Sequence, residues 1–142
     1  MEKTVSTTYF PGSQPVVVNP GYGGFTLDEY LLDQFNNIFG SGNFNPYDPE
    51  LSVRTHPKVI SLFEELFNQS NRKTYNQLSF LYIPEQYVKY QAFTVREYDG
   101  AETIELNTHK LAIEMIKEIM NDNNKSQSNK ISEITDILEH PF

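Results

Sequence analysis

The sequence predicts an α+β fold: a small sheet of three or four strands, including a β-hairpin, packed by three helices and followed by a short C-terminal helix. Two observations predict it. Short runs rich in β-branched and aromatic residues alternate with longer segments whose apolar residues recur every three or four positions. Clusters of Gly, Pro and Asn separate these segments, as is typical of turns.

The first half of the chain is predicted to contain short β segments and two helices. Thr26 is expected to cap the first helix, because Glu29 three residues later completes a capping-box pattern, and Gly40 is expected to end it. Pro57 is expected at the first position of the second helix, where its missing N–H costs nothing. The other expected segments are a β-prone stretch at 4–10, a turn at 11–15, a buried strand at 16–18 and a loop at 41–50.

The second half is predicted to contain a hairpin and a long helix. Residues 78–83 and 88–97 are rich in aromatic and β-branched side chains, and the short connection at 84–87 favours antiparallel pairing between them. A long helix is expected from about residue 102 to residue 120.

The C-terminal part differs in composition from the rest of the chain. We expect one α+β domain at 1–120, a polar linker at 121–130 and a helical tail at 131–142. The apolar stripe from Ile131 to Leu138 is too short to form a stable helix alone. We therefore expect the tail to pack on another subunit, which gives a homo-oligomer.

Composition limits the classes of function. The chain has no cysteine, so it has neither a disulfide framework nor a thiolate metal site, and a reducing cytoplasm suits it. A net charge of -8 opposes binding to duplex nucleic acid, because phosphate contacts need a concentrated basic surface. No apolar run is long enough to cross a bilayer, so no membrane partner is expected.

The glycine-rich stretch after the 16–18 strand is the first candidate site. Gly21, Gly23 and Gly24 lie between a strand and a helix start, where free backbone N–H groups and the helix dipole favour an anion. The spacing matches neither the Walker loop nor the dinucleotide fingerprint. The alternative is a tight turn whose glycines supply positive φ angles, with Tyr22 and Phe25 in the core.

Arg54 is the second candidate, because its planar fork suits a phosphate or a carboxylate. The alternative is a salt bridge with one of the many acidic side chains. His56, directly before Pro57, is expected to cap the helix rather than to take part in catalysis.

A third candidate is an acidic cluster at the start of the predicted 102–120 helix. On a helix, Glu102, Glu105 and His109 would share one face and could hold a divalent metal. More commonly such acids only complement the helix dipole, so neither a metal nor a cofactor is expected.

Four stretches, taken in order, resemble successive blocks of a protein family found in bacteriophages and scattered bacteria. They are VVVNPGYGGFTLDEY, RTHPKVISLFEELFNQ, LSFLYIPEQ and REYDGAETIE. The family blocks are an Asn with a Tyr-Gly-Gly-Phe turn, an Arg-x-Asp-Pro helix start, a strand ending in Ile-Pro, and Glu-Tyr-Asp-Gly followed by Glu. His56 stands where the family has Asp, His109 lies one residue from the family's histidine, and the segment after Met120 is extra. The resemblance implies no established enzymatic activity.

The resemblance implies that the Tyr-Gly-Gly-Phe turn, Arg54 and the Tyr98-Asp99-Gly100 turn form three walls of one pocket. It marks Asn19, Tyr22, Gly23, Gly24, Phe25, Arg54, Pro57, Ile83, Pro84, Glu97, Tyr98, Asp99, Gly100 and Glu102. The predicted ligand-binding residues are Asn19, Tyr22, Gly23, Gly24, Phe25, Arg54, Tyr98, Asp99 and Glu102. Aromatic rings can stack on a base, Arg54 and turn amides can hold a phosphate, and carboxylates can accept hydrogen bonds from ribose.

This pattern, with no evident nucleophile, predicts a phage-encoded protein that binds and sequesters a nucleotide immune signal in the cytoplasm of an infected bacterial cell. Such a signal is a cyclic ADP-ribose derivative or a cyclic oligonucleotide. One alternative is a metal-dependent nucleotide hydrolase that uses Glu102, Glu105 and His109. Another is a virion or interaction protein without a small ligand.

Overall fold

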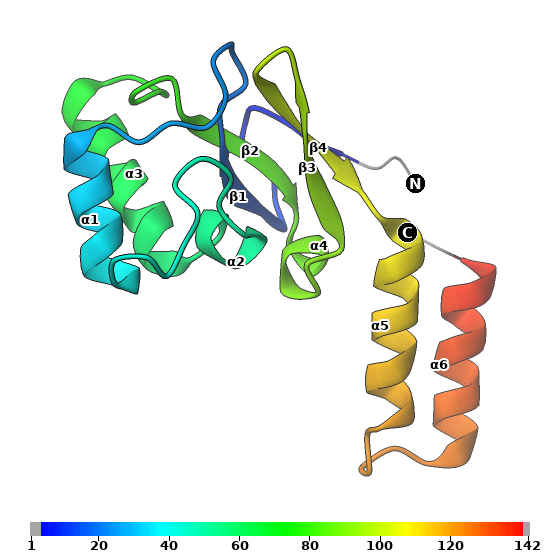
Figure 1. Ribbon diagram of the computed structural model, residues 1–142. Coiled ribbons are helices and arrows are strands. Elements are labelled where there is room, and N and C mark those ends of the chain that lie inside the picture. Colours follow the sequence, from blue (N-terminus) through cyan, green and yellow to red (C-terminus); the bar gives the residue numbers. More distant parts are fainter. Residues whose placement is uncertain (1–3, 141–142) are drawn as a thin grey trace.

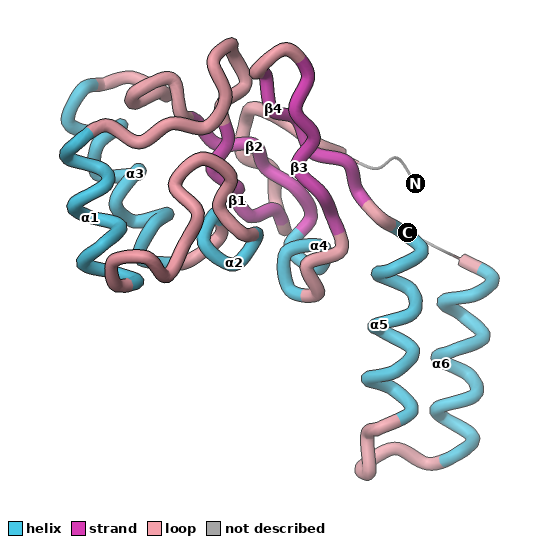
Figure 2. Tube along the Cα trace, viewed as in Figure 1, coloured by secondary structure: helices cyan, strands magenta, loops and turns pink. Residues whose placement is uncertain are grey.

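The fold is α+β, as predicted, but its strands pair differently from the prediction. The computed structural model describes residues 4–140 (Figures 1 and 2), so the predicted domain limits at residues 1 and 142 lie outside the described residues. The elements are β1 (Ser13–Val18), α1 (Glu29–Phe39), α2 (Leu51–Arg54), α3 (Pro57–Ser70), β2 (Ser79–Pro84), α4 (Glu85–Lys89), β3 (Phe93–Tyr98), β4 (Ala101–Leu106), α5 (Thr108–Met120) and α6 (Gln127–Glu139).

Within residues 4–140 the strands form two separate two-stranded antiparallel sheets, β1 with β2 and β3 with β4. In the first sheet Val17 lies opposite Phe80, and in the second Arg96 lies opposite Thr103. The predicted single sheet of three or four strands is therefore wrong. The 4–10 stretch forms no strand and contributes only an isolated bridge between Ser6 and Tyr82.

The predicted hairpin between 78–83 and 88–97 is also wrong. Residues 85–89 form helix α4 instead of a turn, and the partner of β3 is β4, which covers the start of the predicted 102–120 helix. Asp99 and Gly100 have φ angles of 52° and 83°, so they form the two-residue turn that joins β3 to β4. Helix α5 begins only at Thr108, where the Asn107 side chain caps it.

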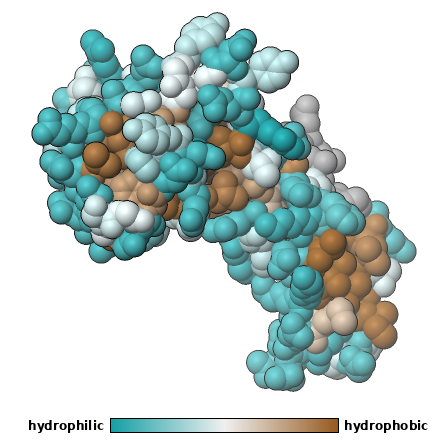
Figure 3. Space-filling model, viewed as in Figure 1, coloured by the Kyte–Doolittle hydropathy of each residue, from teal (hydrophilic) through white to brown (hydrophobic). Residues whose placement is uncertain are grey.

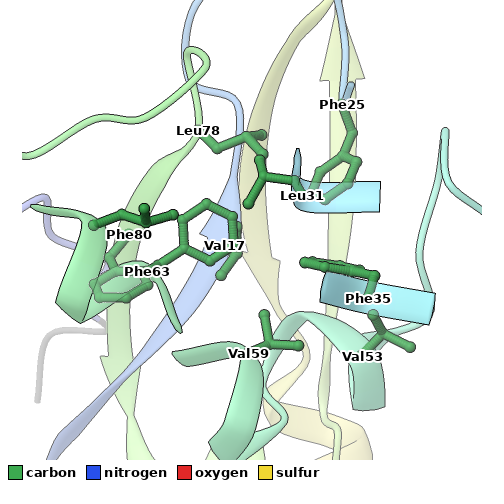
Figure 4. Packing of buried hydrophobic residues seen from close by; sticks show 10 residues of the cluster. Val17, Phe25, Leu31, Phe35, Val53, Val59, Phe63, Leu78 and Phe80 are labelled. Atoms are coloured by element: carbon green, nitrogen blue, oxygen red, sulfur yellow. The ribbon is translucent and has the colours of Figure 1, made fainter. Parts of the chain in front are cut away.

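The three consecutive valines of β1 lie between the two hydrophobic clusters of the core. Val16, Val17 and Val18 are all 0% exposed, so both faces of this strand are covered. Val17 faces a cluster with α1 and α3, whose fully buried rings are Phe35 and Phe63 (Figure 4). Val16 and Val18 face a second cluster, with residues from β2, α4, β3, β4 and α5.

The N-terminal cap of α1 is Asp28 rather than the predicted Thr26. The Asp28 carboxylate accepts a hydrogen bond from the Leu31 N–H at 2.8 Å, and the helix begins at Glu29. A hydrogen bond between Asp28 and the Tyr75 hydroxyl also raises the pKa of that phenol above its ordinary value. Thr26 lies in the preceding loop, where its carbonyl accepts a hydrogen bond from Asn76.

Helices α5 and α6 form a hairpin that extends away from the rest of the molecule (Figure 1). Helix α6 begins at Gln127, earlier than the predicted start at Ile131, because the Ser126 side chain caps it. Lys125 pairs with Glu133 at 2.6 Å, and the ammonium of Lys130 donates to the Met120 carbonyl. Among the described residues, no helix has both the length and the apolar character that crossing a membrane requires.

The cap assignment gives a matched pair of variants. We expect Asp28→Ala to lower the free energy of unfolding by about 1 kcal/mol, because it removes the only side-chain acceptor at the start of α1. Thr26→Ala should change it by less than about 0.5 kcal/mol. Urea denaturation of the two variants and the wild type measures both values, and a larger loss for Thr26→Ala would contradict the assignment.

Candidate functional site

The structure brings the three predicted segments together, with the two turns at the surface and Arg54 buried beneath them. The loop after β1 and the β3–β4 turn lie side by side, because the Gly24 N–H donates to the Gly100 carbonyl at 2.8 Å. One step along β4, the Glu102 N–H donates to the Asn19 carbonyl at 2.6 Å. These two bonds connect the loop to the free edge of β4 and so join the two sheets.

Asn19 organises the loop from inside. It is 2% exposed, and its amide nitrogen donates to the carbonyls of Tyr22 at 3.1 Å and Gly24 at 2.7 Å. Its side-chain oxygen accepts from the Gly21 N–H at 2.9 Å, in an Asx-turn. Since all of these bonds are internal, the side chain of Asn19 fixes the loop conformation rather than facing a ligand.

The two turns approach so closely that Gly100 has no room for a side chain. A Cβ atom there would lie 2.5 Å from the Gly23 nitrogen and 3.1 Å from the Gly24 nitrogen. Gly23 and Gly24 themselves have φ angles of 98° and 72°, which disfavour other residues. The glycines thus serve the backbone geometry of the turn, as the alternative interpretation of this stretch expected. Phe25 is buried, as that interpretation also expected, but its placement of Tyr22 in the core is wrong, because Tyr22 is 79% exposed.

Beneath the turns lies a buried ion pair between Arg54 and Glu102. Arg54 is 1% exposed and Glu102 is 6% exposed. The two guanidinium Nη atoms donate to the two Glu102 oxygens at 3.0 and 2.8 Å, a bidentate pair. The Phe25 ring covers the guanidinium carbon at 4.7 Å, in a cation–π contact.

The remaining donors of Arg54 are used as well. Nε donates to the Pro49 carbonyl, Nη1 also donates to the Val17 carbonyl, and Nη2 also donates to Asp48. A guanidinium has five N–H donors, so all five have partners inside the protein. Arg54 therefore has no free donor for an outside anion, and the phosphate clamp predicted for it would first require this network to open.

The proposed metal ligands do not converge. Glu102 and Glu105 lie on strand β4, three residues apart, so their side chains point to opposite faces of the sheet. His109 belongs to α5, and Glu105 pairs with Arg96 at 3.3 Å. The shared helix face predicted for these residues is wrong, and residues 4–140 contain no group of three His, Asp or Glu side chains that could hold a metal ion.

The exposed part of the site consists of aromatic and acidic side chains. Tyr22 is 79% exposed and Tyr98 is 81% exposed, although the turns that carry them are bonded to each other. Asp99 lies at the tip of the β3–β4 turn, and the Glu97 carboxylate lies close to Gly24. We call Tyr22, Tyr98 and Asp99, together with Arg96, the two-turn surface; Glu97 lies between Arg96 and Tyr98 on β3, so its side chain leaves the opposite face.

Arg96 was not predicted as a site residue. It lies two residues before Tyr98 on β3, so both side chains leave the same face of the sheet, and most of its side chain is exposed. One sequence signal could have identified Arg96. The Asp99-Gly100 pair lies between two segments in which apolar and polar residues alternate, and this pattern indicates a two-residue hairpin, with Arg96 on the same face as Tyr98.

Two other residues are placed by the structure outside this surface. His56 caps α3, as predicted, because its Nδ1 accepts from the Lys58 N–H at 3.1 Å, and Pro57 is the first residue of that helix.

A cavity of about 240 Å³ opens beside β2, between Tyr9, Phe67 and Lys73, and none of the predicted site residues lines it.

Comparisons with protein families, with curated proteins and with solved structures found no match to this chain. The interpretation of the site therefore depends on its own geometry.

The close approach at Gly100 can be tested against a glycine with a similar φ angle. Gly100 and Gly42 have φ angles of 83° and 80°, but a Cβ atom on Gly42 would meet nothing within 4 Å. Both substitutions by Ala place a side chain at a similar positive φ angle, whereas only Gly100→Ala forces the turns apart. We expect Gly100→Ala to cost about 1–3 kcal/mol more unfolding free energy than Gly42→Ala. Equal costs in denaturant titrations would show that the turns are not held in contact.

Proposed function

We propose that this protein is a binding protein that holds a nucleotide-type small molecule on the two-turn surface and sequesters it without chemical change. The observation that carries the proposal is the exposure of Tyr22 and Tyr98 on two turns that are bonded to each other and braced from beneath. Large aromatic rings on a rigid, exposed scaffold are typical of recognition surfaces, because they lose little conformational freedom on binding.

The side chains of this surface favour a ligand with a base and a sugar. Tyr22 or Tyr98 can stack on a nucleobase, a contact that contributes about 1–3 kcal/mol per base. The Asp99 carboxylate can accept hydrogen bonds from ribose hydroxyls or an exocyclic amino group. For a phosphate, Arg96 replaces Arg54 as the available cation, because its exposed pair with Glu105 is weak and can open.

The biological setting of the proposal comes from the phage resemblance. We propose that the protein is made in infected bacterial cells and removes a nucleotide immune signal, such as a cyclic ADP-ribose derivative or a cyclic oligonucleotide. Sequestration needs tight binding and no catalytic group, and the separation of Glu102, Glu105 and His109 supports it over a metal-dependent hydrolase. We also propose that the protein is a homo-oligomer, since α6 exposes large apolar side chains.

The second candidate is an interaction protein whose partner is another macromolecule. The same two tyrosines favour it, because an exposed pair of aromatic side chains also suits the centre of a protein interface. The two candidates differ in whether a small ligand alone stabilises the fold.

Thermal denaturation with a panel of nucleotides and cyclic nucleotides tests the proposal. A ligand at a hundred times its dissociation constant should add about 2.7 kcal/mol to the free energy of unfolding. We expect Tyr98→Ala to weaken binding of that ligand at least tenfold, while Tyr47→Ala leaves it unchanged. Tyr47 is a matched control, because it is 77% exposed and lies on the loop between α1 and α2.

The bound ligand should be recovered unchanged after the protein is denatured by heat. Recovery of a product that forms only with active protein would favour the hydrolase. A panel that gives no stabilisation would favour the interaction protein. Equal weakening by Tyr98→Ala and Tyr47→Ala would remove the two-turn surface from the site.

A further inference from the structure

One side of the α5–α6 hairpin carries an apolar surface that the rest of the chain leaves exposed. Its exposed fractions are 38% for Ile113, 60% for Met120, 65% for Ile131 and 66% for Leu138. In Figure 3 this surface forms the hydrophobic patch over the hairpin. Single exposed apolar residues are common on proteins, but a cluster on one face marks a surface that associates with something.

The spacing shows that these residues form one continuous stripe on each helix. On α5, Ile113 and Met120 are seven residues apart, which places them on the same face. On α6, Ile131, Ile134 and Leu138 follow the three-and-four spacing of a helix-packing seam. The stripe differs from the faces by which the two helices pack on the body and on each other. Those packing faces contain the buried residues Leu111 of α5 and Ile137 of α6.

The hairpin itself gives this stripe no cover. Two helices packed side by side bury one strip each, and helical architectures normally add a further layer over the remaining apolar face. The body of the protein lies at one end of the hairpin (Figure 1), where Leu111 and Met115 join the second core cluster.

We propose that the stripe is covered by the hairpin of a second copy of this chain, which gives a two-fold symmetric dimer joined by an antiparallel four-helix bundle. In this arrangement the two-fold axis runs along the bundle, and α5 of each subunit packs against α6 of the partner. This inference concerns a surface separate from Tyr22 and Tyr98 and does not depend on ligand binding.

Charge along the edges of the stripe selects a second copy in this orientation. The outer edge of α5 carries Lys110 and Lys117, and the outer edge of α6 carries Glu139. Lys117 already pairs with Glu114 of its own helix at 3.6 Å, so Lys110 is the cation that faces the acidic edge of the other hairpin. The basic edge of one hairpin then lies against the acidic edge of the other. Packing α5 on α5 would bring the lysines together instead, and a net charge of -8 opposes an anionic membrane or nucleic acid as the partner.

Sedimentation equilibrium of the full chain, at concentrations from micromolar to about 100 micromolar, tests the dimer. We expect twice the monomer mass for the wild type and monomer mass for Ile131→Glu, which puts a charge into the stripe. Ser132→Glu is the matched control, because it adds the same charge to the neighbouring exposed position and should stay dimeric. Circular dichroism establishes that each variant keeps its helices.

Glu139→Lys tests the orientation. It should weaken the dimer at least severalfold, and the added Lys110→Glu should restore part of the affinity, because a two-fold axis along the bundle brings residue 110 of α5 level with residue 139 of the partner's α6. A wild type that remains monomeric at every concentration overturns the inference. So does a dimer that Ile131→Glu leaves intact, or a monomer that floats with phosphatidylcholine vesicles.

Discussion

The buried ion pair between Arg54 and Glu102 connects most of the elements that meet at the candidate site. Through Arg54 it holds the end of α2, the Pro49 carbonyl in the preceding loop, and the Val17 carbonyl in β1. Through Glu102 it holds β4 and the N–H of Asn19. Burying two charges is costly, and the cost is offset only when every donor and acceptor has a partner. That condition is met here, so the partners of the pair are fixed in position.

The turns depend on this arrangement. Asn19 can bond the carbonyls of Tyr22 and Gly24 only where its own backbone is held, and that backbone bonds Glu102 on both its N–H and its carbonyl. The loop then reaches Gly100, where the absence of a side chain permits contact. The buried polar and charged side chains thus fix the geometry of the turns, and Tyr22 and Tyr98 stay exposed, where the proposed function assigns them to recognition. This division favours a ligand that is bound by stacking and by acceptor groups.

Helical periodicity was a good guide to parts of this fold. The stripes of α1 and α3 follow from residue spacing, the cap at His56 follows from its place before Pro57, and the burial of β1 follows from its three consecutive valines. The α+β class is confirmed. The pairing of β1 with β2 could not be predicted from local sequence patterns. The two strands are distant in sequence, and no local signal specifies which strand is the partner of which. The error at β4 is different: Asp99-Gly100 is a local hairpin signal, but the acids after it were interpreted as a helix start.

The candidate site shows the same limit. The residues that were expected to line a pocket do lie together, at Asn19 to Phe25, at Arg54 and at Tyr98 to Glu102. Sequence could not tell which of them face solvent, because an arginine that clamps an anion and one that is buried against a carboxylate have the same pattern. Burial reverses the interpretation of Arg54 and Glu102, and it leaves Tyr22 and Tyr98 as the exposed members.

A double-mutant cycle on the ion pair tests this account most directly. Unfolding free energies are measured by urea denaturation for the wild type, Arg54→Ala, Glu102→Ala and the double variant. Each single variant should lose about 3–5 kcal/mol, because each leaves one buried charge without its partner, and the double variant should lose clearly less than their sum. Losses below about 1 kcal/mol that simply add, as for a pair on the surface, would contradict the central role of Arg54 and Glu102.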